Sequence, residues 1–247
     1  MDEDGSWVFN RLAEDYRARP GYPPGLVDRL AEVSGGRGTV VADLGAGTGL
    51  LALPLADRGL RVVAVEPSRA MLAILREEAA RRAVEAVQAP AERTGLPRSS
   101  AGAAVVADAL QWIEPALGGL EVARVVADGG VVAVVAARLC GHGFAAAVSA
   151  LVAEANPKAR PRPAARLGQF FRAAGVARWE EETFRQEEPL SPPRLDAVLR
   201  SLSLVGPALG PDRLARLLAE ARGLAEVHGG AVWARDLTLS FGRRSGF

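Results

Sequence analysis

The stretch VADLGAGTGLL at residues 41–51 decides how this chain folds. An apolar run leads into Asp43, three glycines then alternate with small residues, and a second apolar stretch follows. A short β-branched, apolar run that ends at glycine is typical of a buried strand, and the residues after the turn have helical spacing. The stretch therefore predicts a strand, a tight turn and a helix whose first N–H groups face a ligand.

Strand and helix patterns alternate on both sides of this turn, from residue 39 to residue 136. Ser68 is a suitable N-cap for the helix that follows the second strand. Strands alternating with helices predict right-handed βαβ units and a parallel sheet with helices on both faces. The expected strands are 39–45, 60–67, 83–90, 101–110, 129–138, 176–188 and 231–243, and the expected helices are 48–57, 69–83, 115–127, 143–155, 167–174, 193–204 and 211–227.

We expect residues 1–247 to form one α/β domain, because no internal repeat and no low-complexity segment divides the chain. The regular alternation of strands and helices defines a core, and the less regular segments around it are expected to build a helical cap. The core is predicted over about 31–137 and 175–247, and the cap over 1–30, 138–174 and 190–228.

Composition excludes several classes of function. The formal net charge is +1 and aromatic residues make up 5% of the chain, so no basic surface or stacking platform for nucleic acid is expected. The chain has one cysteine, Cys140, and two histidines, which argues against a metal site. The acidic opening MDEDGSWVFN has no apolar h-region and no stretch is long and apolar enough to span a bilayer, so we expect a soluble cytoplasmic protein without a membrane partner.

Two ligand classes fit a glycine turn of this kind. A dinucleotide fold requires G-x-G-x-x-G, but the position of the third glycine is occupied by Leu50. Asp43 places a carboxylate at the strand end, which would repel a pyrophosphate and would suit a ligand that carries an ammonium and a sulfonium. Glu66 ends the next strand, where an acidic residue can accept two ribose hydroxyls. A nicotinamide-dependent oxidoreductase therefore stays an alternative, and a binding comparison of the two cofactors would decide it.

Four stretches in order carry a resemblance to a known family: VADLGAGTGLL, VVAVEPSRAML, APAERTGLP and ADALQWI. The chain resembles the class I S-adenosylmethionine-dependent methyltransferases. Its opening, RLAEDYRARPGYPPGLVDRL, is similar to the Y-x-x-x-R-P-x-Y-P lead-in of a small-molecule subgroup. The resemblance implies a Rossmann-like, mostly parallel seven-stranded sheet with helices on both faces and a helical cap. It also implies that S-adenosyl-L-methionine donates a methyl group to a small-molecule acceptor.

The resemblance assigns roles residue by residue. Asp43 would accept from the methionine ammonium, and Glu66 would hold the ribose hydroxyls. Apart from the resemblance, the segment with Tyr16, Arg19 and Tyr22 is either a helix and proline turn packed on the domain or a lid over the cofactor, in which Arg19 pairs with a carboxylate. The candidate catalytic residues are Asp108, Tyr16 and Trp112. The remaining cofactor contacts would be Gly45, Ala46 and Gly47 at the methionine and ribose, Pro67, Ser68 and Met71 near the adenine, Ala91 and Glu92 at the adenine edge, and Asp108 and Ala109 near the sulfonium.

Two positions depart from the family pattern. The family often has Asp at the position of Pro90, where it meets the adenine amine, and many relatives have His at the position of Gln111. An amide is no general base, so Gln111 argues against basic catalysis at that position. These departures keep open the alternative of an S-adenosylmethionine-binding regulatory or partner protein with little catalysis. The chain is expected to be a monomer or a homodimer, and the sequence does not identify the acceptor.

Overall fold

The computed structural model describes residues 8–157 and 165–245 of the chain. Residues 1–7 and 158–164, which belong to the predicted cap, therefore lie outside the described residues. The chain divides into two compact units. The sheet unit comprises residues 21–136, 162–184 and 238–247, and the helical unit comprises residues 1–20, 137–161 and 185–237.

A seven-stranded sheet is the main feature of the fold, with the strand order β3-β2-β1-β4-β5-β7-β6. The pairs from β3 to β5 are parallel, and β7 runs antiparallel to its neighbours. This confirms the predicted α/β fold with a mostly parallel sheet. The strands are β1 (Val40–Leu44), β2 (Arg61–Val65), β3 (Val84–Val87), β4 (Ala101–Ala107), β5 (Val126–Leu139), β6 (Glu180–Leu190) and β7 (Ala231–Arg243).

The register of the central strands brings three turns to one edge of the sheet. Leu44 pairs with Val65, so β1 and β2 end side by side, and β4 runs parallel to β1 on its other side. In an open parallel sheet, ligands bind outside the carboxyl ends of the strands, at the point where the strand order reverses. Here that point lies between β1 and β4, because the chain proceeds outward from β1 in one direction and from β4 in the other.

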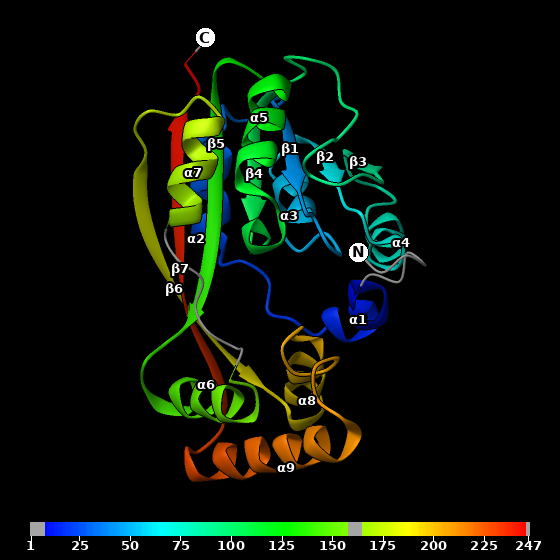
Figure 1. Ribbon diagram of the computed structural model, residues 1–247, viewed down its shortest axis with the longest axis vertical. Coiled ribbons are helices and arrows are strands. Elements are labelled where there is room, and N and C mark those ends of the chain that lie inside the picture. The colour runs from blue at the N-terminus through cyan, green and yellow to red at the C-terminus, as the bar shows by residue number, and fades with distance from the viewer. Residues whose placement is uncertain (1–7, 158–164, 246–247) are drawn as a thin grey trace. The chain divides into compact units, whose positions relative to one another are not determined.

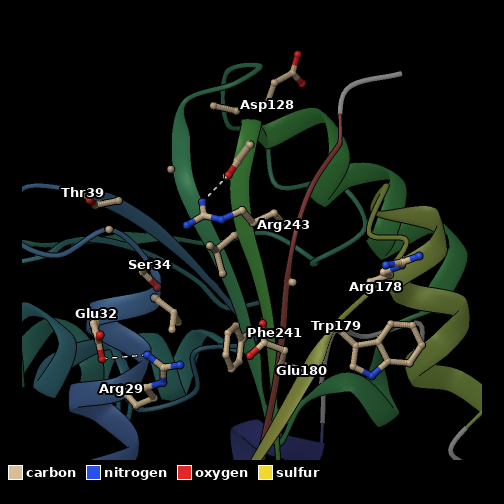
Figure 2. Close-up of a pocket in the computed structure, with 18 residues that line it drawn as sticks. Arg29, Glu32, Ser34, Thr39, Asp128, Arg178, Trp179, Glu180, Phe241 and Arg243 are labelled. Atoms are coloured by element: carbon tan, nitrogen blue, oxygen red, sulfur yellow. Dashed lines mark hydrogen bonds and ion pairs between the residues drawn. The ribbon is translucent and has the colours of Figure 1, made fainter.

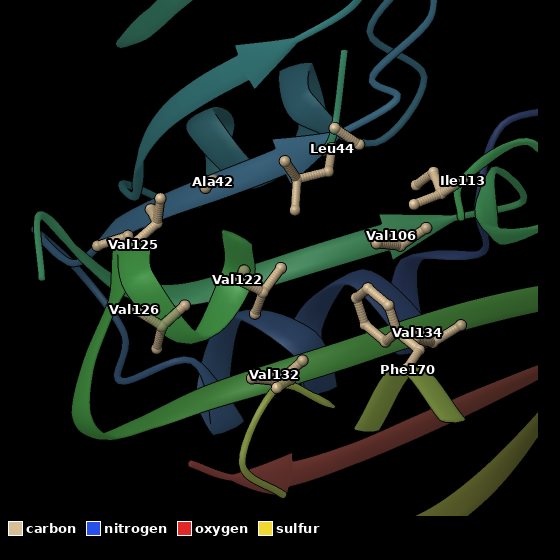
Figure 3. Packing of buried hydrophobic residues seen from close by; sticks show 14 of the residues in the cluster. Ala42, Leu44, Val106, Ile113, Val122, Val125, Val126, Val132, Val134 and Phe170 are labelled. Atoms are coloured by element: carbon tan, nitrogen blue, oxygen red, sulfur yellow. The ribbon is translucent and has the colours of Figure 1, made fainter. Parts of the chain in front are cut away.

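Helices cover both faces of the sheet unit, with α5 and α7 on the near side of the sheet in Figure 1 and α2 and α3 on the far side. The aliphatic side chains of β1, β4 and β5 pack with Val122 of α5 and Phe170 of α7 (Figure 3). The helices are α2 (Pro24–Val33), α3 (Ala52–Asp57), α4 (Arg69–Glu78), α5 (Pro115–Val125) and α7 (Ala165–Ala173), with the 3-10 turn η1 (Leu110–Trp112).

A glycine of α5 allows α7 to lie directly on that helix. A Cβ atom added at Gly119 would lie 2.6 Å from both the Cβ of Ala173 and the carbonyl oxygen of Phe170. A Cβ added at the neighbouring Gly118 would lie 2.4 Å from Ile113. Real Cβ atoms do not approach this closely, so α7 can pack against α5 because Gly119 lacks a side chain, and Gly118 leaves room for Ile113.

The predicted helix starts are confirmed at Ser68 and wrong at residue 48. The Ser68 hydroxyl accepts a hydrogen bond from the backbone N–H of Met71, as an N-cap should. The helix expected over 48–57 begins only at Ala52. Gly49 has a φ of 90°, which lies in the left-handed region and cannot continue a right-handed helix. The turn is therefore longer than the helical spacing suggested.

The helical unit contains α1 (Val8–Tyr16), α6 (Gly143–Ala155), α8 (Pro192–Ser201) and α9 (Pro211–Val227). It has its own apolar core, in which Phe144 and Val148 of α6 pack with Leu195 and Leu199 of α8 and Leu217 of α9. The strands β5, β6 and β7 each contribute residues to both units. The predicted core and cap boundaries stay a prediction.

None of the helices within the described ranges has both the length and the apolar character needed to cross a bilayer.

A buried charge cluster fastens the connection between β3 and β4 to α5. The backbone N–H and the hydroxyl of Thr94 both donate to Oε1 of Glu121, at 2.8 Å and 2.6 Å. Arg124 donates to both carboxylate oxygens of Glu121 at 2.7 Å. The hydrogen bonds from Arg124, and after them those from Thr94, lower the pKa of Glu121 to about 2, against the effect of burial.

Replacing this carboxylate should destabilise the sheet unit. We expect Glu121→Ala to lower the free energy of unfolding by about 1.5–3 kcal/mol, the range for hydrogen bonds to a charged group. Because the pKa of Glu121 is depressed, the stabilisation is complete above pH 4.5 and is lost as the pH falls towards 2. Urea unfolding of wild type, Glu121→Ala and the exposed control Glu85→Ala measures the effect. Equal stability of the three proteins at pH 7 would contradict a structural role for the cluster.

Candidate functional site

The glycine turn after β1 passes against the end of β4 without room for a side chain. Gly45 has a φ of 77°, and a Cβ atom there would lie 2.7 Å from the Cβ of Ala109. The N–H groups of Gly45 and Ala46 donate to the carbonyl oxygen of Val65, at 2.8 Å and 3.1 Å. The turn is thus held to the end of β2 by hydrogen bonds, and it lies in close contact with Ala109, which follows β4.

Asp43, at the end of β1, carries a buried carboxylate. The residue is 1% exposed, and neither carboxylate oxygen has a hydrogen-bond partner among residues 8–157 and 165–245. Burial, and after it the nearby negative charge of Glu66, raises the pKa of Asp43 from 3.8 to about 7. A buried polar group normally has a partner, so an orphaned carboxylate at a ligand-binding edge points to a cationic ligand group.

Glu66 follows β2 and is fixed by backbone groups. Its residue is 4% exposed. One carboxylate oxygen accepts from the N–H of Gly47 at 2.9 Å, and the other accepts from the N–H of Ser68 at 2.8 Å. Burial raises the pKa of Glu66, and these two backbone hydrogen bonds oppose the rise. A carboxylate oxygen can accept more than one hydrogen bond, so a carboxylate held in this way can also receive a pair of hydroxyls.

Asp108 follows β4 in a strained backbone conformation. Its φ is 50°, in the left-handed region that residues with a side chain seldom adopt. The backbone N–H donates to the carbonyl of Val135 at 2.9 Å, and the amide of Gln111 donates to the backbone carbonyl of Asp108 at 2.6 Å. The Tyr22 hydroxyl donates to Oδ2 of Asp108 at 3.2 Å. Trp112, the other candidate on this side, is 37% exposed in η1.

The sequence pattern favours Tyr16 as the catalytic tyrosine, whereas the structure pairs Tyr22 with Asp108. Both tyrosines belong to the segment RLAEDYRARPGYPP, which therefore indicates that a tyrosine lies near the site. The pattern does not indicate which of the two reaches the end of β4. Tyr16 and Arg19 lie in the helical unit. Their predicted lid role stays a prediction.

Within the helical unit, the Arg19 guanidinium lies over the Tyr16 ring, 4.1 Å from its centroid. It also donates to the hydroxyl and carbonyl oxygens of Ser201, at 2.8 Å and 2.9 Å. These contacts attach the end of α1 to α8.

The residues predicted near the adenine follow β2 and β3, with Met71 in the first turn of α4 and the others in the connecting segments. Met71 and Ala91 are buried, and Pro67 is half-buried before Ser68. Glu92, expected at the adenine edge, accepts a hydrogen bond from the backbone N–H of Glu114 at 2.8 Å. Its carboxylate therefore links the segment after β3 to the start of α5. The Thr94–Glu121 contact joins the same segment to α5.

A pocket of about 940 Å³ opens at the opposite edge of the sheet unit, at the amino ends of β1, β4 and β5 (Figure 2). Two arginines of the pocket are bound by neighbouring acidic and carbonyl groups. Arg29 bonds to Glu32 at 3.0 Å and to Glu182 at 2.8 Å, and Arg243 donates to the carbonyl of Gly129 at 2.8 Å. This pocket does not contain the glycine turn, Glu66 or Asp108, and its mixed charges do not select one ligand class.

Comparison with known proteins agrees with this geometry. Residues 42–134, which hold the glycine turn, Glu66 and Asp108, match the family model described as a methyltransferase domain. Residues 42–134 of the chain are therefore similar to methyltransferase domains. This confirms the family predicted from the four sequence stretches, and S-adenosylmethionine is the cofactor on which that family depends.

Uncharacterised methyltransferases of Mycobacterium tuberculosis and Mycobacterium bovis are 44% identical to this chain over 128 residues. The match covers 51% of this chain and 51% of each relative, so the chain matches about half the length of these proteins.

Solved structures share the fold over most of the chain. A candidate Type II methyltransferase from Anaeromyxobacter dehalogenans is 27% identical with a TM-score of 0.66, over 92% of this chain and 99% of that one. Phosphoethanolamine N-methyltransferase 2 of Haemonchus contortus, in complex with S-adenosyl-L-methionine, is 16% identical with a TM-score of 0.54, over 90% of this chain and 53% of that one. The second likeness shows the fold alone.

The raised pKa of Asp43 makes the stability of the ligand-free protein dependent on pH. Between pH 3.8 and about 7 the folded state holds a proton that the unfolded state loses, so stability falls as the pH rises. The full loss is on the order of 4 kcal/mol, because each tenfold difference in proton affinity between the two states is worth about 1.4 kcal/mol. We expect Asp43→Asn to be more stable than wild type at pH 8 and to lose much less stability between pH 4.5 and pH 8.

Urea unfolding at pH 4.5 and pH 8 measures this difference, with the exposed Asp28→Asn as the matched control. An identical pH dependence in wild type and Asp43→Asn would contradict the raised pKa.

Proposed function

We propose that this chain is an S-adenosylmethionine-dependent methyltransferase that acts on a small-molecule acceptor. The buried, unpartnered carboxylate of Asp43 carries the proposal, because it fits the ammonium of a methionine moiety. Glu66, one strand away and fixed by two backbone N–H groups, fits a pair of ribose hydroxyls. The matched mycobacterial relatives are named as methyltransferases, which supports the same activity here.

In this proposal, each residue at the carboxyl edge of the sheet binds one part of S-adenosylmethionine. Asp43 binds the ammonium, and Glu66 binds the ribose. Gly45 leaves backbone where any side chain would meet Ala109, so the ligand can lie close to the turn. Met71 of α4 and Ala91 after β3, both buried, are proposed to contact the adenine.

Catalysis in this proposal rests mainly on positioning. Bound S-adenosylmethionine supplies a methyl group on a sulfonium, which is displaced as a neutral thioether and needs no acid to leave. The residues therefore have to hold the acceptor in line with the methyl group and exclude water, and such orientation can lower a barrier by roughly 7–11 kcal/mol. The near-zero net charge of the chain, +1, favours a small acceptor over nucleic acid.

Weakening the ribose contact should weaken cofactor binding. We expect Glu66→Gln to raise the Kd for S-adenosylhomocysteine by roughly 10- to 100-fold, since a hydrogen bond to a charged group is worth about 1.5–3 kcal/mol and tenfold in Kd is about 1.4 kcal/mol. Titration calorimetry measures the change. Glu85→Gln, a carboxylate-to-amide change at an exposed position of β3, is the control and should bind as wild type does. An unchanged Kd in Glu66→Gln would contradict the ribose assignment.

Turnover separates an enzyme from a binding protein. Wild-type protein with S-adenosylmethionine and mixtures of small amines, phenols, alcohols and carboxylic acids should release S-adenosylhomocysteine faster than without them. Tight binding of the cofactor with no acceptor-dependent release would favour a regulatory or partner protein. Binding of NAD in place of S-adenosylhomocysteine would contradict the proposal altogether.

A further inference from the structure

Tyr22 and Asp108 meet at the edge of the sheet unit that holds the glycine turn. Tyr22 lies just before α2, whose first residues follow at Pro24. Its hydroxyl donates to Oδ2 of Asp108 at 3.2 Å, and both side chains are half-buried. The two residues are 86 positions apart, so the contact is made by the fold and not by local sequence.

The position of Asp108 is tightly fixed. Its backbone is strained at a φ of 50°, and the amide of Gln111 and the carbonyl of Val135 hold it there. Non-glycine residues in this conformation persist where the surrounding structure enforces them, and they cluster at ligand sites. The next residue, Ala109, abuts Gly45 of the glycine turn, so Asp108 stands beside the proposed cofactor site.

The Tyr22–Asp108 contact brings one hydroxyl and one carboxylate together beside the proposed cofactor site. Gln111 is an amide, and its N–H₂ group is used as a donor to the Asp108 carbonyl. A phenol oxygen can donate one hydrogen bond and accept another at the same time. Tyr22 can therefore accept from an N–H or O–H group while it donates to Asp108.

We propose that Tyr22 and Asp108 form the proton-accepting pair for the methyl acceptor, and that this acceptor is an amine or a hydroxyl compound. The proposal rests on the proposed function. A carboxylic acid acceptor reacts as its anion, which has no proton to give and is repelled by the carboxylate of Asp108. An amine or hydroxyl group is attracted by the same carboxylate and gives up one proton for each methyl group it receives.

The step balances with these residues alone. The nitrogen or oxygen of the acceptor forms a bond to the methyl carbon as the carbon–sulfur bond breaks with its electron pair left on sulfur. The proton of the acceptor passes to the oxygen of Tyr22, and the hydroxyl proton of Tyr22 passes to Oδ2 of Asp108. Asp108 then releases the proton to water, which returns both residues to their starting state.

A binding comparison tests the pair without knowledge of the acceptor. Sinefungin differs from S-adenosylhomocysteine in carrying an amine at the place of the transferred methyl group, so its N–H groups stand in for the cationic reaction centre. We expect wild type to bind sinefungin more tightly than S-adenosylhomocysteine. Asp108→Asn should cut that preference, the ratio of the two dissociation constants, about tenfold, and Tyr22→Phe should cut it about threefold.

The outcomes separate the pair from the cofactor site. Asp28→Asn, an exposed carboxylate-to-amide change, should keep the wild-type preference, and retained S-adenosylhomocysteine binding shows that the variants are folded. An unchanged preference in Asp108→Asn and Tyr22→Phe would overturn the pair. Failure of wild type to bind S-adenosylhomocysteine would overturn the proposed function itself.

The acceptor class has its own test. Release of S-adenosylhomocysteine by wild type is measured with one mixture of amines, phenols and alcohols and with a second mixture of carboxylic acids. The expected result is release with the first mixture, reduced at least about tenfold in Asp108→Asn. Release with the second mixture alone would overturn the assigned class.

Discussion

The account of the site depends on one physical constraint, a buried carboxylate at the end of β1. Asp43 is 1% exposed, and its two carboxylate oxygens have no hydrogen-bond partner in the part of the chain that the structure describes. Its pKa, raised to about 7, leaves part of the carboxyl groups neutral near neutral pH, which reduces the cost of burial. A buried carboxyl group without a hydrogen-bond partner is still less favourable at this position than an apolar side chain. Retaining an acid there makes physical sense when a cationic ligand completes it.

The parallel sheet explains why the site lies at this edge. The glycine turn, Glu66 and Asp108 follow the carboxyl ends of β1, β2 and β4, where the strand order reverses. The pocket at the amino ends has a volume of about 940 Å³, and two of its arginines, Arg29 and Arg243, are matched by local acids and a carbonyl group (Figure 2). Unsatisfied charge, and not cavity size, distinguishes the candidate site from this pocket.

The sequence predicts what local pattern encodes and misses what distant contacts decide. The alternation of apolar runs locates the strands and most helices, and Ser68 marks the start of α4 because an N-cap is a local signal. The later start of α3 depends on the left-handed backbone of Gly49, which periodicity does not report. The Tyr22–Asp108 and Thr94–Glu121 contacts join residues 86 and 27 positions apart, so no spacing rule could have paired them.

Proton release on ligand binding tests the central claim most directly. If Asp43 binds the ammonium of the ligand as a carboxylate, its pKa falls on binding and the protein releases a proton at pH 6.5. Calorimetric titration of S-adenosylhomocysteine in buffers of different ionisation enthalpy measures that release. The account predicts a substantial fraction of one proton released by wild type and much less by Asp43→Asn. Equal proton release in the two proteins would contradict it.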